Sequence, residues 1–309
     1  SGQRGGCPEL VYVSVTPFGR EGPYAEYLTT DLVSWAMGGP MIACGYDDRT
    51  GTPPIRCEGH QAFSLASLFA LSAMLSGLIG EPPGGDFDVS VHEACAGTIE
   101  TGFPYWVYRK EKVNRQTGRQ ATVLPIPPWQ YLCRDGRYVS LMGILPRDQR
   151  SWDGLRVWMG EHGMLGDLDE PRYHDIFALR PPTNRDPAPP DGQHAMAAIG
   201  RFVSSLDSAE VYARGQALML PWGLVHTPYD AAHDEQPVSR GFLAAVSEGD
   251  GSTALYPGNP FVLSESPGEI RRAPGLGEHT GEVLREAGYS ENEIAALARN
   301  RVIALAQGG

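Results

Sequence analysis

A short polar turn, Cys57-Glu58-Gly59-His60-Gln61, places a thiol, a carboxylate, an imidazole and an amide directly before a long apolar stretch. Glu58 and His60 are therefore candidates for an acid/base pair. Helix N-termini favour anions, so a helix that begins here would favour chemistry on acidic groups. The opposing interpretation is that Glu58 is a helix cap or a solvated group, because residues two apart on a turn need not face each other.

The stretch that follows, residues 62–75, must position this turn, and it is predicted to be a helix. Its large apolar side chains cover nearly every face of a 3.6-residue helix, which predicts burial on all sides. These side chains are Phe63, Leu65, Leu68, Phe69, Leu71, Met74 and Leu75. Four serines recur through residues 64–76 and argue against a membrane span.

The first 125 residues alternate between strand and helix patterns. Residues 8–16 are rich in β-branched and aromatic side chains, residues 31–37 are typical of a short helix, and residues 87–91 alternate as a strand. A long helix interrupted at Pro104 is expected over residues 92–112. This succession predicts an α/β layer with a mainly parallel sheet, which makes residues 1–125 the first part of a large domain.

A polar, then proline-rich loop over residues 113–128 predicts the start of a second domain, which we place at 126–222. Asp135-Gly136 between alternating apolar residues predicts a hairpin. Helices are expected at 148–162, 193–206 and 209–217, so this smaller domain is α+β. Residues 223–309 are expected to return to the large domain, and Ser290 with Glu293 forms a capping-box pattern near the end.

The composition of the chain limits the classes of partner that it is expected to bind. The 309 residues carry 25 basic and 37 acidic side chains, a net charge of −12, which argues against nucleic acid and against an anionic membrane surface. The five cysteines are odd in number and contain no C-x-x-C pair, so a reducing cytoplasm is the simpler interpretation. No signal peptide is visible, and a start at Ser-Gly-Gln without Met suggests a processed, trimmed or partial polypeptide.

Several common chemistries lack their motifs. The histidines, including His92, His226, His233 and His279, do not repeat with metal-ligand spacing, so we predict no metal. The sequence has no G-x-S-x-G, no P-loop and no G-x-G-x-x-G after a strand. The sequence therefore lacks the motifs that hydrolase, nucleotide-kinase and dinucleotide-dehydrogenase mechanisms of these types require.

Six segments, in order and in register, are together similar to one family. They are SVTPFGREGPYA, DLVSWAMGG, GTPPIRCEGHQAFSLASLFALSAML, GGDFDVSVHEA, YLCRDGRYVSL and APGLGEHTGEVLREAGYSENEIAAL. Over about residues 8–303 the chain resembles the class III CoA-transferases, the CaiB/BaiF family. The resemblance implies a Rossmann-like large domain, a smaller domain, and two chains that interlock as linked rings.

The resemblance also implies a reaction. In that family CoA moves from an acyl-CoA to a carboxylic acid through an aspartyl anhydride and thioester, with CoA as substrate and no permanently bound cofactor. Candidate CoA contacts are the loop residues Thr16, Phe18 and Gly19, and Gly59 with His60 before the helix. The family aspartate lies nine residues after the second proline of the Pro-Pro pair, which places Phe63 at that position here.

Three interpretations follow. The first is a CoA-transferase polypeptide that is the non-catalytic partner in a heteromer, with the family's longer N-terminal segment absent from this sequence. The second is an active transferase, or a related acyl-CoA enzyme, in which Glu58 replaces the aspartate after a local gap. The third is a non-enzymatic acyl-CoA-binding or scaffold protein. A homodimer or a heteromer with a sibling subunit is expected.

Overall fold

The computed structural model describes residues 7, 9–47, 51–99, 102–181, 186–266 and 268–306. Its contacts divide the chain into two compact units, residues 1–225 and 226–309. The predicted domain boundaries near residues 125 and 222 stay a prediction.

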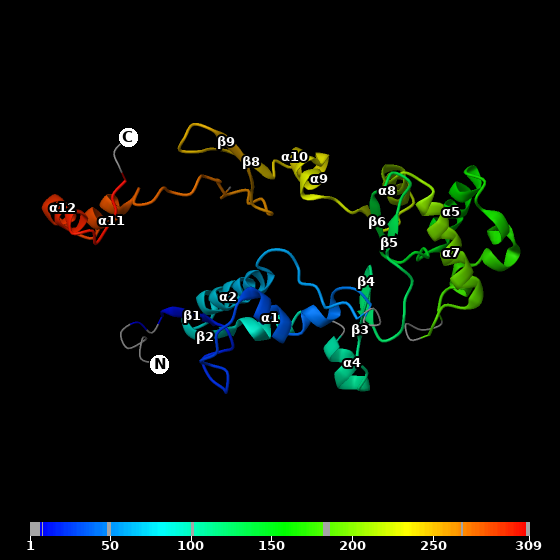
Figure 1. The fold of residues 1–309 in the computed structure, drawn as a ribbon, viewed down its shortest axis with the longest axis horizontal. Helices are drawn as coiled ribbons and strands as arrows, with labels where there is room; N and C mark the ends of the chain where they lie inside the picture. Colours follow the sequence, from blue (N-terminus) through cyan, green and yellow to red (C-terminus); the bar gives the residue numbers. More distant parts are fainter. Residues whose placement is uncertain are drawn as a thin grey trace. The chain divides into compact units, whose positions relative to one another are not determined.

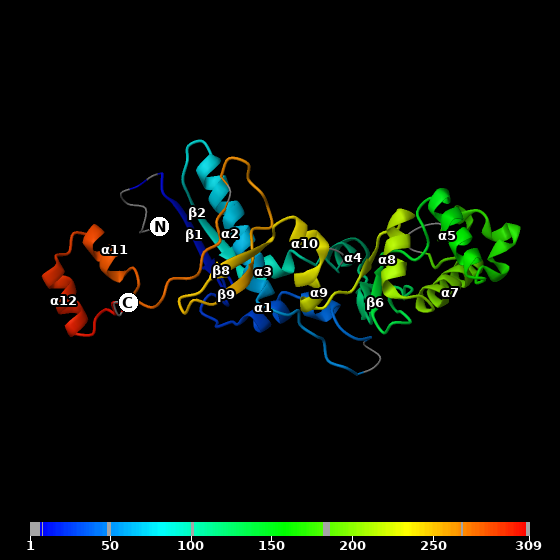
Figure 2. The same cartoon turned by 90° about the horizontal axis from the view of Figure 1, so that it is seen from above.

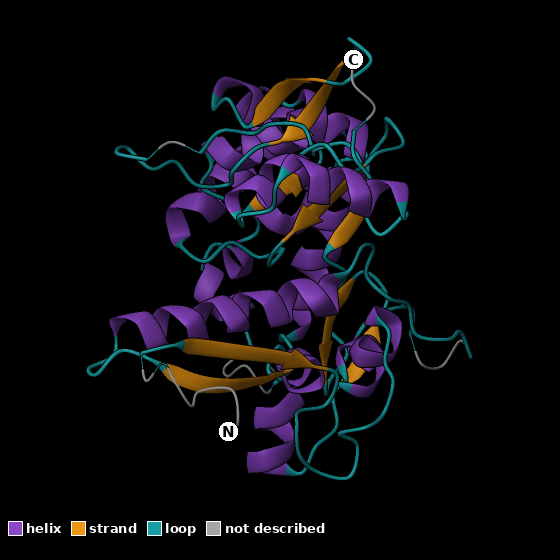
Figure 3. Ribbon diagram, turned by 90° about the vertical axis from the view of Figure 1, so that its left-hand side faces the viewer, coloured by secondary structure: helices purple, strands orange, loops and turns teal. Residues whose placement is uncertain are grey.

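The first unit begins with a parallel pair of strands. β1 (Val11–Thr16) and β2 (Gly85–Ser90) pair in register from Val11 opposite Gly85 to Thr16 opposite Ser90. Helix α2 (Gln61–Ile79) lies in the connection between them and packs on both strands (Figures 1 and 3). The predicted strands and helix are confirmed, except that Pro8 lies outside the described residues.

Short helices complete this layer. They are α1 (Asp31–Met37), the 3₁₀ turn η1 (Pro40–Ala43) and α3 (Val91–Ala96). Their buried apolar residues form a small core with the start of α2: Trp35, Ala62, Ala66, Val91, Ala94 and Cys95. The expected 92–112 helix is instead broken, because α3 stops at Ala96 and α4 (Gly102–Arg109) starts afresh with Pro104 in its first turn, where proline is tolerated.

The expectation that α2 is buried on all sides is wrong for this chain. Its buried residues are the small ones, Ala62, Ala66 and Gly77. A Cβ on Gly77 would lie 2.9 Å from Phe87 and from Val11, so small residues let the helix approach the two strands closely. The large side chains other than Leu65 are consequently exposed, over a sheet that has two strands in the described part of the chain. By length and composition alone, α2 is also the one helix in the described chain long and apolar enough to cross a membrane.

The segment expected to be a loop, residues 113–128, contains a small hairpin. Its strands are β3 (Asn114–Gln116) and β4 (Arg119–Thr122), which pair antiparallel across a turn with Gly118 at φ +62°. Polar residues dominate both strands, so the alternation that normally reveals a strand is missing.

A second sheet and its helices form the rest of the first unit. β5 (Gln130–Leu132), β6 (Tyr138–Leu141) and β7 (Trp222–Leu224) are antiparallel in that order, which confirms the Asp-Gly hairpin. The helical elements are α5 (Gln149–Glu161), η3 (Gly166–Asp169), η4 (Pro171–Tyr173), α6 (Ile176–Leu179), α7 (Pro190–Ser204) and α8 (Ser208–Ala217). Their core is closed around Trp152, Trp158, Trp222 and Phe202.

The second unit contains α9 (Pro228–His233), α10 (Glu235–Ser239), and the hairpin of β8 (Leu243–Ser247) with β9 (Thr253–Pro257). It ends in the helix pair α11 (Thr280–Glu286) and α12 (Glu291–Arg299) (Figure 2). The predicted capping box is confirmed: the Glu293 amide donates to the Ser290 hydroxyl, and the Ser290 amide donates to the Glu293 carboxylate.

Candidate functional site

The start of α2 is capped by a residue from another helix. His60 occupies the N-cap position without a side-chain capping bond. The Ala62 amide instead donates to Oδ1 of Asp31 at 2.8 Å, and the Phe63 amide donates to the same oxygen at 3.4 Å. A buried carboxylate, only 7% exposed, thus satisfies amides that a helix N-terminus leaves unpaired.

Asp31 was not among the predicted site residues. It is the first residue of α1, with Thr30 as that helix's own N-cap, and sequence separation hides its contact with α2. The only local signal is an acid in a first helical turn, which by itself predicts a favourable charge at its own helix. Its effect reaches a buried thiol as well: burial raises the pKa of Cys95, and the Asp31 charge raises it further.

Phe63, which the sequence count predicts at the family's nucleophile position, lies in the first turn of α2. Its ring is 40% exposed and stacks on the His60 ring, with centroids 6.2 Å apart and planes 17° apart. The Ser67 hydroxyl donates to the Phe63 carbonyl. His60 is therefore engaged with an apolar ring at this helix start.

Glu58 lies in the turn before α2 and is exposed. Gly59 supports this turn with a φ of +77°. The contact that ties the turn to the helix is made by the Glu58 backbone, whose carbonyl accepts from Gln61 Nε2 at 3.1 Å. Among the described residues no hydrogen bond or ion pair joins the Glu58 carboxylate to His60, so the structure does not bring the predicted acid/base pair together.

The loop after β1 holds the other predicted contacts. The Gly19 amide donates to the Thr16 hydroxyl at 2.9 Å, and Gly19 has a φ of +94°, a conformation that favours glycine. The Phe18 ring lies beside Tyr24 and His92, with centroid distances of 5.8 and 5.6 Å. Thr16, Phe18 and Gly19 thus form one ordered turn.

Arg20 fixes this turn to the sheet. Its guanidinium pairs with Asp86 at 2.9 Å and with Asp88 at 3.7 Å, and its amide donates to Asp88 Oδ2 at 2.8 Å. Because two carboxylates already face it, Arg20 is a structural cation in this chain rather than an open anion-binding group.

The two sets of predicted contacts lie at the same edge of the sheet. Gly77, near the end of α2, packs on Val11 at the start of β1, so α2 runs antiparallel to the strand and begins near its carboxyl end. Ligands of open α/β sheets bind outside the carboxyl ends of the strands. No hydrogen bond or ring contact within the described ranges joins Thr16, Phe18 or Gly19 to Gly59 or His60.

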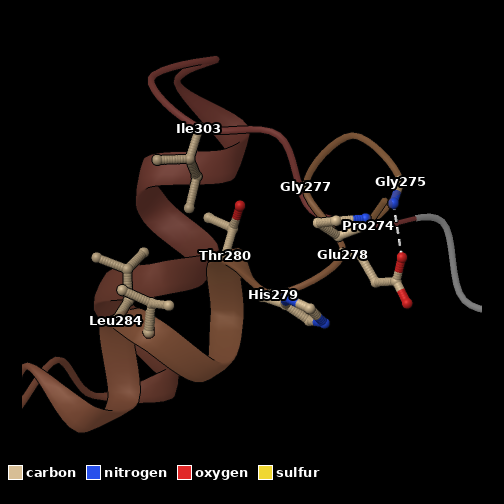
Figure 4. Close-up of a pocket in the computed structure, with 9 residues that line it drawn as sticks. Pro274, Gly275, Gly277, Glu278, His279, Thr280, Leu284 and Ile303 are labelled. Carbon is tan, nitrogen blue, oxygen red and sulfur yellow. Dashed lines mark hydrogen bonds between the residues drawn. The ribbon is translucent and has the colours of Figure 1, made fainter. Parts of the chain in front are cut away.

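The second unit has a separate hollow of about 410 Å³ beside α11 (Figure 4). Glu278 lies at its rim, bound to Arg272 at 2.6 Å and accepting the Gly275 amide at 2.6 Å. The Arg272 hydrogen bonds, aided by the Gly275 amide, lower the pKa of Glu278 to about 2. This carboxylate has a structural role, because it holds the Arg272 side chain and the Gly275 backbone together. None of the predicted site residues lines this hollow.

No cluster of His, Cys, Asp or Glu suited to a metal is found in the part of the chain that the structure describes.

Comparison with known proteins identifies the family. CoA-transferase family III matches residues 4–280. The succinyl-CoA:(R)-benzylsuccinate CoA-transferase subunit BbsE of Thauera aromatica is 30% identical over 298 residues, covering 94% of this chain and 68% of that protein. The succinyl-CoA–L-malate CoA-transferase beta subunit of Chloroflexus aurantiacus is 26% identical over 307 residues, covering 96% and 70%.

The fold agrees with this assignment. A crystal structure of a CAIB/BAIF family protein from Brucella suis matches with a TM-score of 0.65 at 20% identity, over 90% of this chain and 68% of that one. The CaiB/BaiF-type fold expected from the six sequence segments is thereby confirmed. Because the family match spans most of the residues and the Thauera relative is covered over two thirds of its length, this chain belongs to CoA-transferase family III, whose members transfer CoA between thioesters and carboxylic acids.

Proposed function

We propose that this chain is the non-catalytic subunit of a heteromeric CoA-transferase, in which a sibling chain supplies the nucleophilic carboxylate. The observation that carries the proposal is Phe63 in the first turn of α2, the residue that the count from the Pro-Pro pair predicts at the family's aspartate position. Covalent transfer through an anhydride needs a carboxylate oxygen that attacks the thioester carbonyl. A phenyl ring has no such atom.

The carboxylates near the start of α2 support this view in different ways. Asp31 is buried and its Oδ1 accepts two backbone amides, so its geometry is that of a cap. Glu58 is exposed in the preceding turn, without a contact to His60 that would orient it as a general base or nucleophile. Positioning contributes as much to such a step as the nucleophile itself.

The outward face of α2 supports the presence of a partner chain. Its large apolar side chains are each at least 40% exposed: Phe63, Leu68, Phe69, Leu71, Met74, Leu75, Leu78 and Ile79. The hydroxyls of Ser67, Ser72 and Ser76 donate to carbonyls of the same helix, so they add little polarity to this face. Apolar patches of this kind mark interaction sites.

A protein partner, rather than a lipid bilayer, is the proposed cover for α2, since serines recur along it and the family is one of CoA-transferring enzymes. On the same grounds we propose that the chain works in the cytoplasm. The names of two relatives, from Thauera and Chloroflexus, describe subunits, which favours a heteromer over a homodimer. Both names include succinyl-CoA, which makes succinyl-CoA the first donor to test.

In this proposal the chain contributes CoA contacts. Thr16, Phe18 and Gly19 offer an ordered glycine turn, and Gly59 with His60 lies at the same edge of the sheet. Coenzyme A and its thioesters are substrates here, so no resident cofactor is proposed.

The test compares the chain alone with the chain co-expressed with an aspartate-bearing family III sibling encoded beside it. Transfer from succinyl-CoA to benzylsuccinate or L-malate is followed by chromatography of the CoA esters. We expect transfer only by the pair. Phe63→Asp in the lone chain is expected to restore little CoA transfer, because the new carboxylate would lack the groups that position the thioester against it. Transfer by the lone chain that Glu58→Gln abolishes would overturn the proposal and make Glu58 the nucleophile.

A further inference from the structure

Two cysteines lie in segments that pack against each other beside the predicted site. Cys44 closes η1, is half-buried, and its amide donates to the Met41 carbonyl at 3.2 Å. Cys57 is exposed in the turn before α2. Cys57 is near enough to Cys44 to raise the pKa of the Cys44 thiol. All five cysteines of the chain are outside disulfides in this structure.

The backbone around the pair is held in place independently of the thiols. A Cβ on Gly45 would lie 3.2 Å from the Ile55 amide nitrogen, so the segments that carry the cysteines run against each other. Arg115 of β3 ties both sides, since its Nε donates to the Tyr46 carbonyl and its Nη2 to the Thr52 carbonyl, each at 2.6 Å. A buried arginine with two short bonds thus keeps the two segments paired.

The two thiols differ in access. Burial raises the pKa of Cys44, and the neighbouring Cys57 charge and hydrogen bond raise it further. Cys57, which is exposed, is the sulfur that a reagent in solution reaches first. Cys44, on the segment packed against this turn, is the neighbouring thiol available to attack an oxidised Cys57, as a resolving cysteine does beside a redox-sensitive thiol.

We propose that Cys44 and Cys57 form a reversible disulfide under peroxide. The Cys57 sulfur attacks the peroxide O–O bond and becomes a sulfenic acid while one water leaves. The Cys44 sulfur then attacks the Cys57 sulfur, the S–O bond breaks, and the hydroxyl leaves with the Cys44 proton as a second water. Two thiols and one hydrogen peroxide give one disulfide and two waters, and a dithiol reverses the bond by exchange.

The bond would tether the turn of Glu58, Gly59 and His60 to the end of η1. Disulfides in reducing compartments, where they occur, are mostly transient and redox-sensing, which agrees with a pair that is near but not joined. Any effect on CoA binding rests on the proposed function, whereas formation of the bond does not.

The test treats the full-length chain with hydrogen peroxide, blocks free thiols with N-ethylmaleimide and digests with trypsin and Glu-C. Cleavage after Glu26, Arg49, Arg56 and Glu58 puts Cys44 in fragment 27–49 and Cys57 in fragment 57–58. Cuts after Glu93 and Glu100 isolate Cys95 in a third fragment. We expect 27–49 joined to 57–58, lighter than the sum by two hydrogens, and separated by dithiothreitol.

Cys44→Ser and Cys57→Ser are each expected to abolish the joined fragment, while the exposed Cys7→Ser leaves it unchanged. In Cys44→Ser, Cys57 is expected to stop at the sulfenic acid, which dimedone traps even if the variant is less stable. The proposal is overturned if Cys57 links to Cys7, Cys95 or a second chain instead. Full N-ethylmaleimide labelling of both cysteines after peroxide would overturn it as well.

Discussion

Asp31 anchors the start of α2 through two backbone amides, and its removal has a defined cost. Asp31→Ala leaves the buried Ala62 amide without its acceptor. We expect the free energy of unfolding to fall by about 1–2 kcal/mol, the usual loss for a capping side chain. Urea denaturation followed by circular dichroism measures the change.

The matched control is Asp31→Asn, which keeps an acceptor oxygen of the same reach. It is expected to lose clearly less stability than Asp31→Ala, because the amide bonds survive. Equal losses in the two variants would mean that charge or packing, and not the capping bonds, explains the role of Asp31.

Glu278 predicts a pH dependence in the second unit. Its folded pKa of about 2 lies below the ordinary value of 4.5, so the ion pair with Arg272 adds stability that is complete above pH 4.5. That stability is lost as the pH falls from about 4.5 through about 2. We expect Glu278→Gln to lower the melting midpoint at pH 7 and to flatten its decline in acid.

Glu286→Gln is the control for Glu278, since it removes a carboxylate from α11, the helix that follows the Glu278 turn, without removing the Arg272 ion pair. Calorimetric melts between pH 7 and pH 3 compare the two variants with the unmodified chain. The same acid slope in Glu278→Gln and in the unmodified chain would contradict the account.

At the residue scale the sequence predicts Phe63 at the nucleophile position but does not indicate the role of Asp31. The Phe63 prediction comes from counting along a segment that resembles the family, which needs only local order, and it stays a prediction. Asp31 lies in a different helix from the amides it caps, and no local pattern signals such a contact. Glu58 and His60 were proposed from proximity in sequence, yet proximity on a turn does not set side-chain direction.

At the element scale α2 carries the main structural prediction. Its outward apolar face should make the isolated chain associate at micromolar concentration. Leu68→Glu places a charge in the middle of that face, where Leu68 is 61% exposed in the chain alone. We expect association to weaken by about tenfold or more, since burying an unpaired charge is strongly unfavourable. Sedimentation velocity measures it.

Val157→Glu in α5 is the matched control, because Val157 is equally exposed at 63% but lies outside α2. It is expected to leave association unchanged. A monodisperse monomer for the unmodified chain, or equal effects of the two substitutions, would count against α2 as the contact surface.

Most elements could be predicted, and the failures have physical causes. Strand and helix alternation predicted β1, α2 and β2, and the Asp-Gly turn predicted the β5–β6 hairpin. The exposure of α2 could not be predicted from its periodicity, because the pattern does not reveal that the sheet it packs on has two strands in the described residues. The β3–β4 hairpin was missed because its strands are polar.

At the scale of the whole molecule, the family assignment came from six segments that are each weak and are informative together. Shared order over most of the chain fixes the family, because unrelated chains do not keep several spaced motifs in register. Catalytic competence belongs to single positions, which is why family membership leaves the role of this chain to be tested at Phe63 and Glu58.

The most direct test of the central claim is intact-mass analysis of the purified chain after incubation with succinyl-CoA and trapping with borohydride. A family III chain that carries the aspartate, treated in parallel, confirms that the trap works. We predict no covalent change in the mass of this chain, because the Phe63 ring carries no nucleophilic oxygen and the Asp31 carboxylate accepts two backbone amides. A mass change that shows one carboxylate reduced to a primary alcohol, with CoA released, and that is lost in Glu58→Gln would contradict the account.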